Sequence, residues 1–275
     1  FEVVEKTGIT GVLVETAVYD KTGAAVSHLD PSAFTILEDD EPQAIDLATR
    51  ETIPTDVVLL VDNSQSMSRR LDFVRRATER LTQGIGPKDH VTVAPFNGHL
   101  GTITGPTTDR ATVRDAIVAM QAGGGTAMLD SLVEGANLLR GAQGRRVLVL
   151  LTDGWDENST ATADEALTVL QETQATVYVV AIGGVAGISL RGGDTLRRIA
   201  EQTGGRIYFP PRDTEMVTVA DRITSDAHSR YLLTYTPTNQ RKDGTWRAIT
   251  VTVPAGLTVR ARAGYFAPDP PPIRP

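Results

Sequence analysis

The sequence predicts an α/β fold in which a doubly wound, mostly parallel sheet is inserted in a small antiparallel β domain formed by both termini. Two observations support this prediction. From about Thr55 to Ala227, short runs rich in β-branched residues alternate with longer segments of helical periodicity, an order typical of a parallel sheet covered by helices. Outside that range, apolar and polar residues alternate at every second position, as in half-buried antiparallel strands.

The central region is expected to contain a series of buried strands joined by helices. The short apolar runs that predict strands lie at 57–61, 90–96, 146–151, 176–182 and 206–209. Helical patterns lie around 68–83, 110–121, 127–140, 162–173, 194–203 and 214–227. A short edge strand near Gly101–Thr104 is expected to pair with 90–96 as a hairpin. Gly204 and Gly205 predict the end of the helix before them.

The two flanks carry strand patterns of a different kind. Between Gly11 and Tyr19, the valines and Thr16 fall on one side of a predicted strand. Near the other end the predicted inward residues are Ile249, Val251 and Val253, followed by Val259, Ala261 and Ala263. Neither flank alone holds enough strands for a stable sheet pair. We therefore expect β segments at 1–53 and 229–268 to form one domain, a second domain at 54–228, and a Pro-rich tail at 269–275.

A carboxylate and two hydroxyls follow the first predicted strand of the central region. Asp62, Ser64 and Ser66 come directly after the apolar run 57–61, and a helical pattern follows them. In open α/β sheets, ligands bind at the carboxyl ends of the strands, and side-chain oxygens suit a hard divalent cation. Asp and Ser are also ordinary turn and N-cap residues, so this segment alone leaves both interpretations open.

Two distant segments strengthen the metal-site interpretation. Thr126 follows three glycines at the start of a predicted helix, and Asp153 ends the strand 146–151 in a Thr-Asp-Gly sequence. Taken singly, Thr126 would be a helix N-cap and Asp153 a turn former. Three oxygen-bearing loops of this kind in one sheet are much harder to attribute to local structure alone.

These motifs resemble the metal-ion-dependent adhesion site of the von Willebrand factor type A family. That site combines D-x-S-x-S, a Thr in a Gly-rich loop and an Asp at a later strand end, and the matching positions are Asp62, Ser64, Ser66, Thr126 and Asp153. The resemblance implies a Rossmann-like fold. It also implies that the two serines and the threonine contact a cation, with the two aspartates often acting through water.

Mg²⁺ is the expected ion, because it prefers octahedral oxygen sites that keep several waters. Ca²⁺ and Mn²⁺ stay open as alternatives. Asp156 and Glu157 beside the site would favour Ca²⁺ if they faced the ion, but an acidic solvated loop is the simpler interpretation. The family also implies a protein partner whose carboxylate completes the coordination of the metal.

The flanks resemble the bacterial VWFA-related subfamily that is common in acidobacteria. The segments that carry this resemblance are Phe34–Asp39, Tyr231–Pro237 and Val259–Pro268. It implies an exported protein, secreted or held at the cell surface. Because the sequence begins at Phe1 and not at Met, we expect either a processed form whose export signal was removed or a cloned piece.

The composition limits the classes of function. A formal net charge of −7 argues against nonspecific nucleic-acid binding, which needs a basic surface. No apolar run approaches the length needed to span a bilayer. The sequence has no cysteine, so it forms no disulfide, and its redox compartment is undetermined.

The sequence favours binding over catalysis. Its histidines are scattered, with no recognisable catalytic spacing, at His28, His90, His99 and His228. We therefore expect a non-enzymatic, divalent-cation-dependent adhesion module that binds a protein. The alternative is a structural protein that assembles with its own copies into filaments or oligomers by adding its terminal strands to a neighbouring sheet. A minor alternative is a metal-assisted hydrolase.

Overall fold

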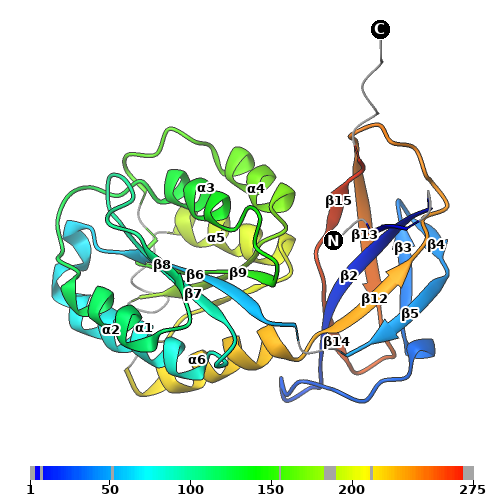
Figure 1. The fold of residues 1–275 in the computed structure, drawn as a ribbon, viewed down its shortest axis with the longest axis horizontal. Coiled ribbons are helices and arrows are strands. Elements are labelled where there is room, and N and C mark those ends of the chain that lie inside the picture. Colours follow the sequence, from blue (N-terminus) through cyan, green and yellow to red (C-terminus); the bar gives the residue numbers. More distant parts are fainter. Residues whose placement is uncertain are drawn as a thin grey trace, which may run out of the picture. The chain divides into compact units, whose positions relative to one another are not determined.

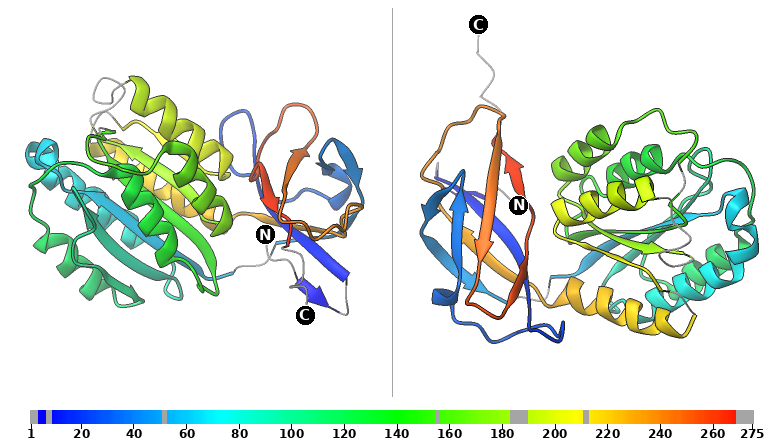
Figure 2. Two further views of the ribbon diagram at one scale, coloured as in Figure 1. Left: turned by 90° about the horizontal axis from the view of Figure 1, so that it is seen from above. Right: turned by 180° about the vertical axis from the view of Figure 1, so that it is seen from behind.

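The computed structural model describes residues 4–6, 9–50, 53–154, 156–182, 190–210 and 213–268. The chain divides into two compact units (Figures 1 and 2). One consists of Ile53–His228, and the other combines Phe1–Thr52 with Ser229–Pro275. Phe1 and the Pro-rich tail predicted at 269–275 lie outside the described residues.

The larger unit is built on a six-stranded sheet with the order β11-β10-β9-β6-β7-β8. Its strands are β6 (Thr55–Asp62), β7 (His90–Phe96), β8 (Thr104–Thr107), β9 (Arg145–Thr152), β10 (Thr176–Ala181) and β11 (Arg206–Tyr208). All neighbouring strands run parallel except β7 and β8. The predicted doubly wound α/β fold is confirmed.

Helices cover both faces of this sheet (Figure 1). On one side lie α1 (Leu71–Gly84), α2 (Arg110–Ala119) and α6 (Asp213–His228), and on the other α3 (Met128–Leu138), α4 (Ala163–Glu172) and α5 (Leu190–Gln202). Successive strand residues face opposite sides, so Val57, Leu59 and Val61 join one core cluster and Val58 and Leu60 the other. Burial on both faces explains why the central strands are continuous apolar runs.

Several boundaries in this unit differ from the sequence prediction, and α5, for example, begins at Leu190 and not near 194. The helix predicted to begin near residue 68 is preceded by a 3₁₀ helix, η2 (Gln65–Arg70), and α1 begins only at Leu71. The edge strand expected near Gly101–Thr104 was placed too early, since β8 begins at Thr104. The chain first folds back on itself, with Asn97 N donating to His99 O and Gly101 N to Pro95 O, so pairing with β7 resumes only opposite Val93.

The second unit consists of two antiparallel sheets. The first contains β1 (Val4–Lys6), β2 (Ile9–Tyr19), β12 (Tyr231–Tyr235) and β5 (Ile45–Thr49), with β14 (Thr258–Arg260) also paired to β2. The second has the order β15-β13-β3-β4, from β15 (Gly264–Phe266), β13 (Trp246–Thr252), β3 (Thr35–Glu38) and β4 (Glu41–Gln43). A 3₁₀ helix, η1 (Pro31–Ala33), precedes β3. Each sheet therefore contains strands from both flanks of the sequence.

The strand alternation predicted for the flanks holds in two segments and fails in a third. Val12, Val14 and Thr16 are fully buried on one side of β2, and Ile249 and Val251 are buried in β13, as predicted. The predicted strand from Val259 to Ala263 is wrong, because β14 ends at Arg260 and the side chain of Arg262 is buried. Here the chain crosses between sheets. Arg260 pairs with β2, whereas the carbonyl of Ala263 accepts from Ile249 N in β13.

Candidate metal centre

Three loops of the α/β unit are tied together at the carboxyl end of β6 and β9. The loop after β6 contacts the Gly-rich loop through two backbone hydrogen bonds, from Gln65 N to Gly124 O at 3.0 Å and from Gly123 N to Asn63 O at 2.8 Å. The loop after β9 donates two more to Thr126 O, from Glu157 N and Asn158 N. The segments that carry the predicted metal ligands therefore form one connected surface.

The Asp62 carboxylate is buried and held on both oxygens. It ends β6, and its Oδ1 accepts from Ser64 N at 3.0 Å while its Oδ2 accepts from the Thr152 hydroxyl at 2.7 Å. Burial raises the pKa of Asp62, and the charge of Asp153 adds a smaller increase that the Ser64 and Thr152 hydrogen bonds oppose. This influence of one carboxylate on the other indicates that both belong to the same electrostatic site.

The two serines of the motif present their hydroxyls side by side. Ser64 is buried, Ser66 is exposed, and their Oγ atoms lie 3.0 Å apart. Two neighbouring ligands of an octahedral ion with metal–oxygen bonds near 2.0–2.1 Å lie about 2.9 Å apart. The spacing of the hydroxyls therefore suits two adjacent positions on such an ion, as well as the hydrogen bond that they can make to each other.

Thr126 is placed by the Gly-rich loop and does not cap the helix that follows. The residue before α3 is Ala127, so the N-cap interpretation of Thr126 is wrong. Gly124 takes a positive φ of 78°, and a Cβ on Gly125 would lie 2.1 Å from Asn158 Oδ1. Thr126 itself is buried, and its N–H donates to that same Asn158 oxygen at 3.1 Å.

Asp153 follows β9 and has one oxygen without a partner. Its Oδ2 lies 3.9 Å from Arg70 Nη1, whereas its buried Oδ1 has no hydrogen-bond partner among the described residues. A buried polar atom left unpaired is costly, and native structures usually satisfy it with protein, water or an ion. This oxygen is therefore available to accept from a water or to bind an ion.

The sequence profile of the von Willebrand factor type A domain matches residues 56–222, more than half of the chain. The chain belongs to the von Willebrand factor type A family. The VWFA-related subfamily stays a prediction, because the profile identifies the family alone. No match was found among the curated proteins.

Solved structures of similar fold include other members of this family. The von Willebrand factor type A protein from Catenulispora acidiphila has 14% identity and a TM-score of 0.57, with 96% of this chain and 76% of that one covered. The corresponding domain of the type V pili tip protein Mfa5 from Porphyromonas gingivalis has 12% identity and a TM-score of 0.52, over 64% of this chain and 95% of that one. The pilus adhesin SpaC from Lactobacillus rhamnosus GG, in its open conformation, has 11% identity and a TM-score of 0.52, over 90% of this chain and 49% of that one. At these identities the likeness shows the fold alone.

The residues of this von Willebrand factor A domain fit the ion that the family implies. The donor set is two carboxylates and three hydroxyls, all oxygen, and it includes the unpaired oxygen of Asp153. Within the described ranges, no group of three or more His, Cys, Asp or Glu side chains is arranged to hold a metal. An ion at these loops would therefore depend on neutral hydroxyls as much as on carboxylates.

The Asp156 carboxylate, which the Ca²⁺ alternative would use, is held by backbone amides on both oxygens. Its carboxylate accepts from Leu129 N at 3.3 Å and from Ser159 N at 3.2 Å, where it contacts the first turn of α3. Glu157 is exposed. The acidic loop therefore serves to attach the chain after β9 to the start of α3, and neither side chain provides a reason to prefer Ca²⁺.

Sequence reasoning missed three residues that organise the site. Thr152 fixes Asp62, Asn158 fixes the backbone of Thr126, and Arg70 faces Asp153. Thr152 had a signal, since it stands beside Asp153 at the end of a buried strand. Asn158 lies in a polar segment without periodicity, and Arg70 is one of several arginines at the start of a predicted helix, so only the folded arrangement reveals them.

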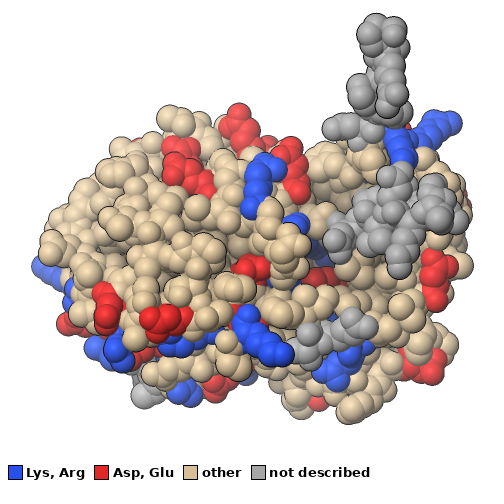
Figure 3. All heavy atoms as spheres, viewed as in Figure 1, with Lys and Arg blue, Asp and Glu red and all other residues tan. Residues whose placement is uncertain are grey.

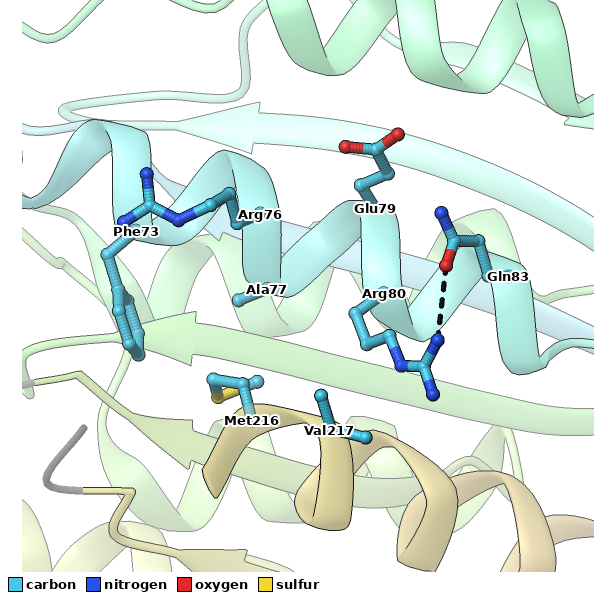
Figure 4. A pocket seen from close by; sticks show the side chains of 8 residues that line it. All are labelled: Phe73, Arg76, Ala77, Glu79, Arg80, Gln83, Met216 and Val217. Carbon is cyan, nitrogen blue, oxygen red and sulfur yellow. Dashed lines mark hydrogen bonds between the residues drawn. The ribbon is translucent and has the colours of Figure 1, made fainter. Parts of the chain in front are cut away.

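A groove between α1 and α6 is another candidate site of this domain. It has a volume of about 240 Å³, with Phe73, Ala77, Met216 and Val217 on its apolar side (Figure 4). The guanidinium of Arg80 donates to Gln83 Oε1 at 3.3 Å and lies 3.7 Å from Asp221 Oδ1. The charge of Arg80 therefore already has a carboxylate nearby, and the groove lining does not gather oxygens as the three loops do.

Proposed function

We propose that this chain is a non-enzymatic, divalent-cation-dependent protein-binding module. Asp62, Ser64, Ser66, Thr126 and Asp153 would hold the ion, directly or through water, with Mg²⁺ as the first choice and Ca²⁺ or Mn²⁺ as alternatives. The bound ion would supply a positive charge and an open coordination position for an oxygen ligand. A carboxylate on the protein partner is the group that suits such a position best.

The observation that carries this proposal is the buried, unpaired Oδ1 of Asp153. The oxygen lies on the loop that is hydrogen-bonded to Thr126, and the Asp153 charge acts on Asp62. A rigid set of oxygens with one unsatisfied member is the arrangement expected of a prepared cation site. The chain's own contacts therefore support the function that the family suggests.

The distribution of charge and the related folds are consistent with a surface-binding role. On the face seen in Figure 3, acidic and basic side chains of the described residues are interspersed without a large basic patch, so nucleic acid is not a favoured partner. No helix of the described residues is long and apolar enough to cross a membrane. Pilus and adhesin proteins are among the similar folds, which supports a secreted or cell-surface location.

The two alternatives have less support. Assembly by donation of the N-terminal strand would require that strand to be available, but β1 pairs with β2 of the same chain from Val4–Gly11 to Lys6–Ile9. Metal-assisted hydrolysis would use a water activated by the ion, with a general base beside that water at the three loops. His90 lies 3.1 Å from Asp56, and His228 lies 2.8 Å from Asp89. Both aspartates are near the amino ends of strands β6 and β7, whereas the candidate metal centre is at the carboxyl ends.

Titration calorimetry with MgCl₂, MnCl₂ and CaCl₂ tests the proposal directly. The full chain should bind Mg²⁺, and Asp153→Ala should weaken that binding by at least about tenfold, because a charged ligand is lost. Asp115→Ala is the matched control, since Asp115 is an exposed aspartate of α2 and its loss should leave the affinity within about twofold. Absence of binding in the wild-type chain, or equal affinity in the two variants, would refute the cation site.

A further inference from the structure

Arg70 occupies a special place beside the candidate cation site. It ends η2, the 3₁₀ helix that begins within the D-x-S-x-S motif, at Gln65. Its Nη1 donates to the carbonyl of Ile182 at the end of β10 at 3.2 Å, and the same atom lies 3.9 Å from Asp153 Oδ2. The side chain is 39% exposed, so solvent reaches it although Nη1 donates to Ile182.

The formal charges of the site change sign when a divalent ion binds. Asp62 and Asp153 together carry two negative charges, and Arg70 carries one positive charge. Without an ion the three side chains carry one net negative charge, and with a divalent ion they carry one net positive charge. Without Arg70, the two carboxylates would cancel the ion completely, and the loaded site would have no net charge to attract an anion.

The neighbouring charges do not remove this effect. The carboxylate of Asp156 is held by the amides of Leu129 and Ser159. Glu157 and Arg69 are exposed, so solvent and salt screen them. Arg70 is the charged side chain that the described contacts place against Asp153.

We propose that Arg70 makes the loaded site selective for an anionic group of the partner and at the same time lowers its affinity for the cation. This inference rests on the proposed cation site. The guanidinium repels the ion, with which it competes for Asp153, and its N–H groups form a planar fork that matches a carboxylate. The partner class is therefore a protein with an exposed Asp or Glu, and a neutral oxygen ligand would bind less well.

Arg70→Gln, Arg70→Lys and the matched control Arg69→Gln separate the two effects. Arg69 is the exposed neighbour in the same 3₁₀ helix, so its variant removes the same charge without touching the Asp153 contact. Mg²⁺ affinity is measured by calorimetry on the full chain. Acetate, as the carboxylate probe, is then titrated into the Mg²⁺-saturated protein and followed by the amide NMR shifts of Ser64 and Thr126.

The two affinities should move in opposite directions in Arg70→Gln. We expect Mg²⁺ to bind about twofold to fivefold more tightly and acetate about threefold to tenfold more weakly. Arg70→Lys should keep the wild-type Mg²⁺ affinity but lose part of the acetate affinity, because an ammonium lacks the planar fork. If Arg70→Gln fails to fold, the acetate affinity of Arg70→Lys still tests the role of the guanidinium.

Equal behaviour of the Arg70 and Arg69 variants in both titrations would overturn the role of Arg70 while leaving the cation site intact. Loss of acetate binding together with weaker Mg²⁺ binding would also overturn it, since that result would make Arg70 a structural support. A wild-type chain that binds no Mg²⁺ would overturn the proposed function and this inference together. The two failures are therefore distinguishable.

Discussion

Two aspartates of the α/β unit are buried to the same extent and have opposite environments. Asp89 and Asp153 are each only 3% exposed. Asp89 lies just before β7, and its carboxylate accepts from Thr55 N, Gly86 N and His228 Nε2, each at 2.8 Å. Asp153 lies after β9 with one distant guanidinium and one oxygen that is unpaired among the described residues.

The comparison separates a structural carboxylate from one that is available to a ligand. Asp89 joins Thr55, the first residue of β6, to His228, the last residue of α6, and so holds both ends of the α/β unit. Its burial is compensated by hydrogen bonds within the protein. The burial of the Asp153 carboxylate is not compensated in this way among the described residues. The uncompensated carboxylate lies at the loops where ligands of open α/β sheets bind.

The largest expected effect comes from removing the structural carboxylate. Asp89→Ala should lower the free energy of unfolding by about 3 kcal/mol, because it leaves His228, the buried amide of Thr55 and the half-buried amide of Gly86 without their acceptor. Without added cation, Asp153→Ala should change the same free energy by less than about 1 kcal/mol, since it removes a group that was not satisfied. Urea unfolding in EDTA, followed by far-UV circular dichroism, measures both values.

The distinction between Asp89 and Asp153 depends on the difference in the free energy of unfolding between Asp89→Ala and Asp153→Ala. If Asp153→Ala destabilised the EDTA-treated protein as much as Asp89→Ala, Asp153 would be a structural residue like its counterpart. His228→Gln provides a second measurement for Asp89. It should produce a smaller loss than Asp89→Ala, because the two amide hydrogen bonds to the carboxylate stay in place.

The sequence was sufficient to predict the sheet and its helices, and the loops proposed for the site lie where it predicted, for reasons that are local. Buried parallel strands are continuous apolar runs, and Asp62 and Asp153 come directly at their carboxyl ends. What it missed depends on contacts between distant segments. Arg262 is buried because the chain changes sheets after Arg260, and no alternation of residue types encodes such a crossing.

Asn158 shows the same limit within the site. It lies 32 positions from Thr126, in a loop without a regular pattern, and its role depends on the space that Gly125 leaves open. Gly-rich loops are recognisable in a sequence, but the side chain that fills the space above the glycine is not. The motif therefore predicts the ligands but gives no sign of the residues that position them.

An effect of intermediate size is expected from replacing Asn158. The replacement should change the affinity for Mg²⁺ and leave the stability of the fold almost unchanged. Asn158→Ala should weaken Mg²⁺ binding by about threefold to tenfold, because the Thr126 amide loses a hydrogen bond that fixes the ligand. The free energy of unfolding in EDTA should change by less than about 1 kcal/mol, since Asn158 is exposed. Calorimetry and urea unfolding on the same sample distinguish the two effects.

Asn137→Ala is the matched control for Asn158. Asn137 is an exposed asparagine of α3 whose Oδ1 accepts from Arg140 Nε of the same segment. Its loss should leave the Mg²⁺ affinity unchanged. A decrease in Mg²⁺ affinity of the same size in both variants would show that Asn158 acts through general destabilisation and has no specific positioning role.

The smallest expected effect concerns Asp243, an aspartate of the β unit that combines exposure with complete pairing. The Thr245 hydroxyl, the Thr245 amide and the Arg247 guanidinium lower its pKa from the usual 3.8 to about 2. Because the folded pKa is depressed, the stabilisation is present above the unfolded value of 3.8 and is lost as the pH falls from about 4 to about 2. The side chain is 36% exposed, so solvent keeps this contribution small.

Carbon NMR of the Asp243 carboxyl measures this pKa directly. The titration midpoint should lie near 2 in the wild-type chain and move up toward 3.8 in Thr245→Val, which removes the hydroxyl that lowers it most. A wild-type midpoint close to 3.8 would mean that the hydrogen bonds to Asp243 do not persist in solution. A midpoint near 2 would show that hydrogen bonds to both oxygens stabilise an ionised carboxylate even at the surface. Asp153 lacks such hydrogen bonds among the described residues.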